Sequence, residues 1–229
     1  MRMKTALITG VGRGIGKALA QKFLKEGWNV IGTSQSGKID YEYKNLKVFG
    51  LEMTSNDSVE ALIGELGKNG TKLDMLINNA GILVDNDDTK VTVDNLKKTM
   101  SVNLFGTIEL TERMISKMNA SSHIINISSS AGSLTGATDL RTTHYPYHYP
   151  AYKISKAALN MYTRTLATRL NNEGSSIIVS SVHPGWVKTD MGGDDAPITP
   201  EEAATDIYKL AISNPETGQF WYKGNKYPW

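Results

Sequence analysis

The chain has 229 residues, 40% of them hydrophobic and 21% charged, and this composition excludes a disordered or fibrous protein. Its length suits one α/β domain over residues 1–229. The formal net charge of +2, with scattered Lys and Arg, gives no basic surface for nucleic acid or an anionic membrane, and the absence of cysteine excludes disulfides, thiol nucleophiles and Cys-ligated zinc.

The first residues do not resemble a targeting segment. Met1–Lys4 leads directly into the short apolar run Thr5–Thr9 and then into glycine, which leaves no room for the apolar core of a signal peptide. No run approaches the roughly 18 apolar residues that a membrane-spanning helix needs. We therefore expect a soluble, cytoplasmic protein.

Short apolar runs rich in Val and Ile alternate along the chain with longer segments of helical period. This alternation is typical of repeated strand–helix–strand units around a parallel sheet, so the fold class is α/β. We predict strands near residues 4–9, 29–33, 46–51, 73–78, 123–128, 176–182 and 218–221, and helices near residues 14–26, 58–67, 93–117, 151–171 and 200–213. The irregular stretches 132–150 and 191–197 follow strands, where parallel sheets place functional loops.

A glycine-rich run, Thr9–Gly16, joins the first predicted strand to the first predicted helix with the spacing T-G-x-x-x-G-x-G. Glycine is required where the backbone approaches phosphate oxygens and where a turn takes φ above zero. A helix N-terminus also attracts anions. The run therefore indicates a site for the pyrophosphate of a dinucleotide, and a ligand-free glycine turn is the alternative.

The end of the second strand favours NADP(H) over NAD(H). An Asp or Glu at this place would bind the 2′-hydroxyl of the adenosine ribose and repel a 2′-phosphate. Residues 32–38 contain no carboxylate, Ser34 offers a hydroxyl, and Arg13 in the glycine run can reach the same corner. In the alternative interpretation, Arg13 is a solvated surface charge.

Tyr152 and Lys156 are four residues apart and therefore share one face of a predicted helix. At about 4 Å and an effective dielectric constant near 20, the lysine would stabilise a phenolate by about 4 kcal/mol, or roughly three pKa units before desolvation. Such a phenol can exchange protons near neutral pH. Tyr149 and Lys153 have the same spacing, but Pro150 lies between them, so we favour Tyr152.

Together these motifs resemble the classical short-chain dehydrogenase/reductase family over essentially the whole chain. Three segments, Tyr152–Asn160, His183–Gly193 and the ending Tyr227–Trp229, are similar to the branch of C-factor and small carbonyl reductases. The resemblance implies a single-domain Rossmann fold, a doubly wound seven-stranded parallel sheet flanked by helices. The residues that carry it are Thr9–Gly16, Asn78–Gly81, Asn103, Ile127–Ser129, Tyr152–Lys156 and Pro184–Gly185.

The resemblance implies NADPH-dependent reduction of an aldehyde or ketone. Tyr152 would give a proton to the carbonyl oxygen, Ser129 would orient the carbonyl, and Ser128 and Ser130 are the alternatives to Ser129. Lys156 would also hold the nicotinamide ribose, and Asn103 would anchor a water. Cofactor contacts are implied for Gly10, Arg13, Gly14, Ile15, Gly16, Ser34, Glu52, Met53, Asn79, Ala80, Gly81, Tyr152, Lys156, Pro184, Gly185, Val187 and Thr189.

A second function is consistent with the resemblance, namely a nucleotide-sensing or signalling protein in which cofactor occupancy changes a surface. A pure sensor has no need of Tyr152 and Lys156, so we favour the enzyme. The family resemblance also implies a homodimer or homotetramer. The partner is otherwise a small-molecule carbonyl substrate, and no nucleic acid or membrane partner is expected.

Two further segments have open or negative interpretations. Asp139–Tyr149 lengthens the stretch between Ser129 and Tyr152, and it either walls a substrate pocket or packs against another subunit. Asp85–Asp88 lacks the glycine and glutamate of a calcium loop, so we expect a solvated loop. We expect no metal site, because His144 and His148 are separated by Pro146 and have no third ligand nearby in sequence.

Overall fold

The computed structural model describes residues 2–68, 70–137 and 148–229. Its centre is an eight-stranded sheet in the order β3-β2-β1-β4-β5-β6-β7-β8, parallel throughout except for the pair β7 and β8. The strands are β1 (Thr5–Thr9), β2 (Asn29–Ser34), β3 (Leu46–Gly50), β4 (Leu73–Asn78), β5 (Met118–Ile127), β6 (Ile178–Val182), β7 (Gln219–Tyr222) and β8 (Asn225–Lys226).

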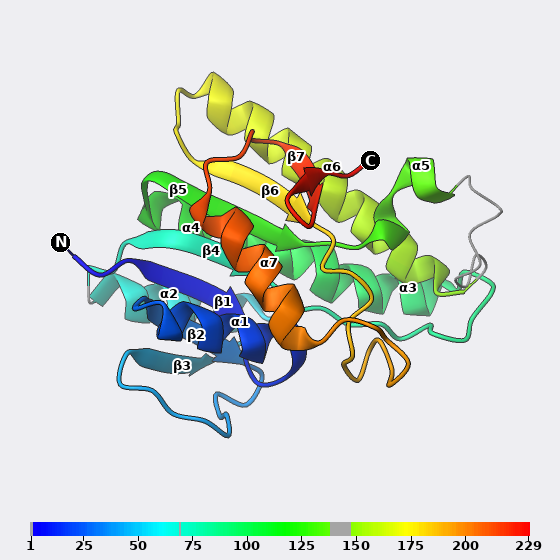
Figure 1. The fold of residues 1–229 in the computed structure, drawn as a ribbon, viewed down its shortest axis with the longest axis horizontal. Coiled ribbons are helices and arrows are strands. Elements are labelled where there is room, and N and C mark those ends of the chain that lie inside the picture. Colours follow the sequence, from blue (N-terminus) through cyan, green and yellow to red (C-terminus); the bar gives the residue numbers. More distant parts are fainter. Residues whose placement is uncertain (1, 69, 138–147) are drawn as a thin grey trace.

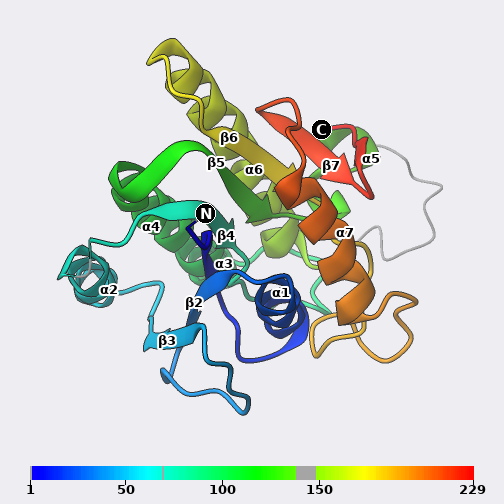
Figure 2. The same ribbon diagram turned by 60° about the vertical axis from the view of Figure 1, so that its left-hand side comes forward.

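Helices cover both faces of the sheet, which confirms the predicted doubly wound Rossmann arrangement (Figures 1 and 2). On one face α1 and α7 lie side by side, and on the other lie α2, α4 and α6. The helices are α1 (Gly14–Lys25), α2 (Asn56–Lys68), α3 (Val93–Met100), α4 (Thr107–Met114), α5 (Leu134–Ala137), α6 (Pro150–Asn172) and α7 (Pro200–Ile212).

The strand order reverses between β1 and β4, and the carboxyl ends of these two strands meet at that point. In open parallel sheets, ligands bind at such a reversal, because the loops on either side turn away from each other and leave a crevice. The glycine run after β1 and Asn79–Gly81 after β4 are therefore neighbours in space.

All seven predicted strands are present, but the sheet has an eighth and is not wholly parallel. The two-residue strand β8 pairs antiparallel with β7 across Lys223 and Gly224, whose φ angles are 48° and 77°. Two positive φ angles are typical of a two-residue hairpin turn. Lys-Gly is not a strong turn signal and the strand has only two residues, so the sequence pattern did not reveal it.

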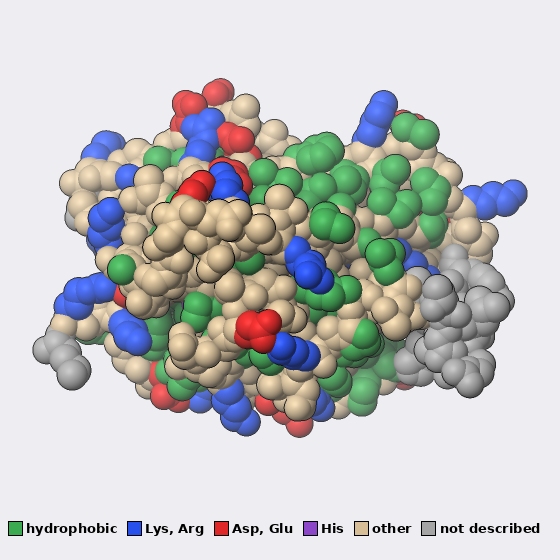
Figure 3. Space-filling model, turned by 90° about the horizontal axis from the view of Figure 1, so that it is seen from above, with side chains coloured by type: hydrophobic (Ala, Val, Ile, Leu, Met, Phe, Trp, Pro, Cys, Tyr) green, Lys and Arg blue, Asp and Glu red, His purple; other side chains and the backbone are tan. Residues whose placement is uncertain are grey.

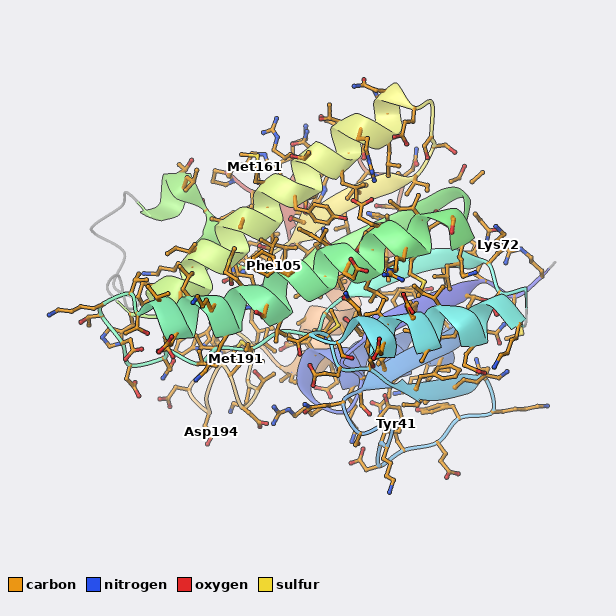
Figure 4. All side chains as sticks on the ribbon, turned by 180° about the vertical axis from the view of Figure 1, so that it is seen from behind. Tyr41, Lys72, Phe105, Met161, Met191 and Asp194 are labelled. Atoms are coloured by element: carbon orange, nitrogen blue, oxygen red, sulfur yellow. The ribbon has the colours of Figure 1, made fainter. Side chains whose placement is uncertain are left out.

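The single helix predicted over residues 93–117 is interrupted. A π-helical turn (Ser101–Gly106) separates α3 from α4, and a short 3₁₀ turn (Ile115–Lys117) follows α4. Together they form one rod beside α6, with Phe105 at its middle (Figure 4). A hydrophobic pattern does not show where a helical turn contains one extra residue, so the interruption was not predicted. Such turns are frequent at functional sites.

Two apolar cores lie on opposite faces of the sheet. Under α1 and α7, the ring of Phe23 meets Trp28 and Tyr208 edge-on, with centroids 5.0 and 4.9 Å apart. Under α2, α4 and α6, the core is mostly Leu, Met and Val. Because every central strand is covered on both sides, the strands read as continuous apolar runs rather than as alternating patterns.

Two surface properties bear on possible membrane and nucleic acid partners. Among the described residues, no helix is long and apolar enough to cross a bilayer. On the face shown in Figure 3, Lys and Arg side chains are scattered among other types rather than gathered into one patch.

One buried and one half-buried histidine make stability depend on pH. His123 on β5 is 3% exposed, with Nε2 2.9 Å from Ser180 Oγ on β6. Burial lowers the pKa of His123 to about 4, and it lowers the pKa of His183, at the end of β6, to about 4 as well. Both side chains are therefore neutral in the native protein at neutral pH.

We expect the free energy of unfolding to fall as the pH decreases from about 6.5 to about 4. In this window the unfolded chain binds protons that the native histidines do not, which lowers the free energy of unfolding by about 1.4 kcal/mol per pH unit for each of the two histidines. Urea unfolding at pH 6.5, 5.5 and 4.5 measures this slope. His123→Asn should be less stable at pH 6.5 but should show a shallower slope, and an unchanged slope would contradict the prediction.

Candidate active site

The glycine turn after β1 forms a cradle that side chains would fill. Gly10 and Gly14 have φ of +74° and +54°, where a side chain is strained. A Cβ on Gly16 would come within 2.0 Å of Gly10 O. Arg13, the N-cap residue of α1, makes no side-chain cap, and the first turn of α1 contains no acidic residue. The turn therefore fits an anionic group such as a pyrophosphate.

The end of β4 fixes the position of this turn. Thr9 Oγ1 accepts hydrogen bonds from the backbone N–H groups of Asn79 and Ala80, at 3.0 and 2.9 Å. Asn79 Nδ2 returns a bond to Thr9 O at 2.9 Å. The predicted residues Asn79 and Ala80 thus brace the glycine turn from the neighbouring strand.

The predicted adenosine corner is only partly assembled. Ser34 lies at the end of β2, where its Oγ donates to Lys38 O at 3.0 Å. Arg13, however, forms an ion pair with Asp190 in the loop after β6, and its side chain is 84% exposed. The guanidinium therefore turns toward Asp190, an acceptor that the sequence pattern did not reveal because it lies 177 positions away.

Glu52 and Met53, predicted for the adenine edge, differ in exposure. The Glu52 carboxylate accepts a hydrogen bond from Gln35 Nε2 at 2.8 Å, and this bond and those from Thr54 hold its pKa below the ordinary value. Met53 is 7% exposed and belongs to the apolar core. Its carbonyl lies against Gly106, where an added Cβ would come within 2.2 Å.

The loop after β6 closes against the glycine turn. Gly185 has φ +92°, and a Cβ there would lie 2.3 Å from Ile198 Cδ1. Val187 pairs with Ile198 in an isolated β-bridge. A Cβ on Gly14 would lie 3.1 Å from the Thr189 methyl group. The predicted contact Thr189 therefore meets the glycine turn at Gly14, and Pro184, Gly185 and Val187 precede it in the same loop.

The side chains of Tyr152 and Lys156 share one face of α6, as the spacing predicted. Lys156 is only 4% exposed, and its Nζ donates to Ile127 O at the end of β5, at 2.8 Å. The same nitrogen lies 5.5 Å from the centre of the Tyr152 ring. A Cβ on Gly81 would lie 3.7 Å from Lys156 Nζ, so the residues that follow β4 and β5 converge on this amine.

The pKa values of this pair differ from the electrostatic expectation. Burial raises the pKa of Tyr152 to about 12, although a hydrogen bond with Ser129 acts in the opposite direction. Burial lowers the pKa of Lys156 to about 8. Desolvation is therefore the largest cause of both shifts, and Tyr152 is a protonated phenol at neutral pH.

Of three consecutive serines, the structure brings Ser129 to the phenol. Ser129 is half-buried and caps a short 3₁₀ turn (Ser130–Gly132), its Oγ accepting from Ala131 N at 3.1 Å. Ser128 is buried and its hydroxyl is directed to Lys156 O. A Cβ on Gly132 would lie 2.5 Å from the backbone of Lys156, so the serine segment packs tightly on α6.

Asn103 occupies the π-helical turn and is 1% exposed. Its Oδ1 accepts from Ile82 N at 2.8 Å, and its Nδ2 donates to Ile82 O and Ser155 Oγ, at 2.9 and 3.1 Å. The side chain thus joins the segment after β4 to α6, one residue before Lys156. These bonds use both N–H groups of the amide and one acceptor position of its oxygen, which the sequence alone did not indicate.

Tyr149 and Asp85 lie beside this site, at the start of α6. Tyr149 precedes α6 with φ 48° and ψ 52°, and its ring meets that of Tyr152 edge-on with centroids 6.1 Å apart. Asp85 is 2% exposed, so the prediction of a solvated Asp85–Asp88 loop was wrong for this residue.

Residues 138–147, which include His144 and make up most of the Asp139–Tyr149 segment, lie outside the described residues. Within the described ranges, no three His, Cys, Asp or Glu side chains form a metal-binding group.

Comparison with known proteins identifies the family. Residues 4–197 match the model of the short chain dehydrogenases. Mouse carbonyl reductase [NADPH] 1 is 28% identical over 272 aligned positions, covering 98% of each chain. C-signal of Myxococcus xanthus is 34% identical over 168 residues, 69% of this chain and 93% of that protein. The NADPH-bound carbonyl reductase from chicken fatty liver superimposes with a TM-score of 0.87 at 30% identity, covering 100% of this chain and 95% of that one.

These matches extend over the segments that carry the glycine turn, the serine segment and α6. The fold, the family-model match and the relatives lead to one assignment. The chain belongs to the classical short-chain dehydrogenases, an oxidoreductase family, near the branch that contains the carbonyl reductases and C-signal.

Proposed function

We propose that the protein is an NADP(H)-dependent reductase that converts an aldehyde or ketone to an alcohol. The observation that carries the proposal is the place of the Tyr152 phenol, hydrogen-bonded to Ser129 and with the buried Lys156 amine 5.5 Å from the centre of its ring. All described strands belong to one sheet, which supports a single catalytic domain over residues 1–229.

The glycine turn, Asn79–Gly81 and the loop after β6 would hold the dinucleotide, whose reduced nicotinamide supplies the hydride when bound. Tyr152 transfers its phenolic proton to the substrate oxygen, which Ser129 orients through a hydrogen bond. Because the pKa of Lys156 is about 8, its amine is mostly protonated at neutral pH, and its charge stabilises the phenolate that remains.

Tyr152→Phe should lower kcat/KM for carbonyl reduction by about 10²- to 10⁴-fold, because the ring stays in place while the transferable proton is lost. Oxidation of NADPH, followed by its absorbance against a panel of aldehydes, ketones and diketones, measures the effect. Tyr149→Phe is the matched control and should retain most of the activity, since the sequence favours Tyr152 over Tyr149 as the proton donor. Full turnover by Tyr152→Phe would disprove the mechanism.

We infer that Arg13 selects NADP(H), by leaving Asp190 for the 2′-phosphate. Arg13→Ala should weaken NADPH binding about tenfold, the loss expected for one charge-assisted hydrogen bond worth about 1.5 kcal/mol, and should leave NADH binding almost unchanged. Fluorescence titration with both nucleotides measures the two dissociation constants. Lys38→Ala is the control at the same corner, and equal losses for NADPH and NADH in Arg13→Ala would contradict the assignment.

A second candidate is a nucleotide-sensing or signalling protein, supported by the 34% identity to C-signal. It makes a different prediction from the reductase in the same experiments. Tight NADPH binding without Tyr152-dependent turnover on any carbonyl would favour the sensor. The presence of both Tyr152 and Lys156 supports the reductase instead.

We further infer a soluble cytoplasmic protein that forms a homodimer or homotetramer and has no nucleic acid or membrane partner. Phe105 and Met161 are 57% and 63% exposed on the helical face formed by α3, α4 and α6 (Figure 4). Large exposed apolar side chains are typical of association surfaces. Sedimentation at micromolar concentration should give the mass of two or four chains, whereas a mass of one chain would overturn the inference.

A further inference from the structure

Asp85 lies outside the catalytic group, yet its carboxylate is tied to the helix that carries Tyr152. The residue is 2% exposed in the segment between β4 and α3. Its Oδ2 accepts a hydrogen bond from Ala151 N, the residue directly before Tyr152, at 2.6 Å. Among the described ranges no Lys, Arg or His forms an ion pair with Asp85, so this backbone bond is its principal polar contact.

The start of α6 needs an external acceptor. The first N–H groups of a helix have no intrahelical partner, and a Ser, Thr, Asp or Asn at the N-cap normally accepts from one of them. Here the N-cap is Tyr149, which makes no side-chain cap, and Pro150 has no N–H. Ala151 therefore carries the first helical donor, and it is fully buried. Asp85 supplies the missing acceptor from 66 positions earlier in the chain.

The same acidic segment holds the residue before the helix. Tyr149 N donates to Asp88 O at 3.0 Å, and Asp88 Oδ2 accepts from Asn95 Nδ2 of α3 at 2.7 Å. Tyr149 is left-handed, a conformation that costs a non-glycine residue free energy and persists only where its surroundings fix it. The Asp85–Asp88 segment thus clamps the entry into α6 at two successive residues with N–H groups, Tyr149 and Ala151.

A buried carboxylate with one hydrogen bond is a poor source of stability, because its desolvation offsets most of the gain. The positive end of the α6 dipole reduces that cost at this one place. One turn further along, Lys156 is anchored independently to Ile127 O. Movement of the first turn of α6 would therefore displace Tyr152 relative to a fixed Lys156.

We propose that Asp85 is a positioning residue: it caps α6 from a distant segment and thereby sets the Tyr152 phenol against Ser129 and Lys156. The inference rests on the proposed reductase function. It assigns Asp85 no contact with substrate or cofactor. Because a displacement of about 1 Å can lower a rate about 100-fold, the expected effect is on kcat rather than on cofactor binding.

The test compares Asp85→Ala, Asp85→Asn and the matched control Asp87→Ala, an exposed neighbour in the same segment. Asp85→Ala should lower kcat 10- to 100-fold, with the NADPH dissociation constant within about twofold of wild type. Asp85→Asn keeps an oxygen acceptor and should restore kcat to within about threefold. Asp87→Ala should match the wild type.

Hydrogen exchange of the peptide over residues 149–156 provides a readout independent of turnover. Exchange should be faster in Asp85→Ala, because Ala151 N–H loses its acceptor, and close to wild type in Asp85→Asn. If Asp85→Ala fails to fold, Asp85→Ser replaces it in the test, because the serine hydroxyl is shorter than the carboxylate and cannot reach as far. We then expect a loss in kcat smaller than that predicted for Asp85→Ala, with exchange faster than in the wild type.

Wild-type kcat in Asp85→Ala, unchanged exchange, or an equal loss in Asp87→Ala would each overturn the positioning role while leaving the reductase intact. A wild-type protein that binds NADPH but reduces no carbonyl would overturn the proposed function and, with it, this inference. The two failures are therefore distinguishable by the wild-type turnover alone.

Discussion

The contact between α6 and the carboxyl end of β5 determines the geometry of the site. Lys156 Nζ donates to Ile127 O, and Gly132 is small enough to let the serine segment reach the helix backbone. Asn160 Nδ2, one turn further along α6, donates to Gly132 O at 3.1 Å. These contacts join strand, serine segment and helix, so the relative positions of Ser129 and Lys156 follow from the close packing at Gly132 and from two buried side-chain donors that bind main-chain carbonyl groups.

A row of buried polar side chains reinforces this contact from beneath. Asn78 Nδ2 donates to Asn126 Oδ1, and Asn126 Nδ2 to Thr163 Oγ1, at 2.8 and 2.9 Å. Thr163 and Ser181 hydroxyls lie 2.9 Å apart. The row therefore joins β4, β5, α6 and β6 just before these strands end. Paired in this way, buried polar groups hold neighbouring strands in register, which places Asn79 and Ile127 opposite the helix.

The sequence predicted features that depend on short-range pattern, and it missed those that depend on distant partners. Strand–helix alternation, the glycine turn and the spacing of Tyr152 and Lys156 are local, so they could be read directly. The Arg13–Asp190 ion pair and the Asp85–Ala151 bond join residues 177 and 66 positions apart, and no local pattern encodes such partners. The raised pKa of Tyr152 was missed for a related reason, since desolvation depends on what the tertiary fold packs around the phenol.

The short strand β8 has a consequence for how copies of this chain can meet. A sheet edge with unpaired backbone groups can recruit a strand from another molecule. Here β7 is covered by a strand of two exposed residues, and the turn and strand carry Lys223 and Lys226. So short and charged an edge is a poor template for continuing the sheet, which protects this side against strand-to-strand aggregation and leaves helical faces as the better surfaces for ordered association.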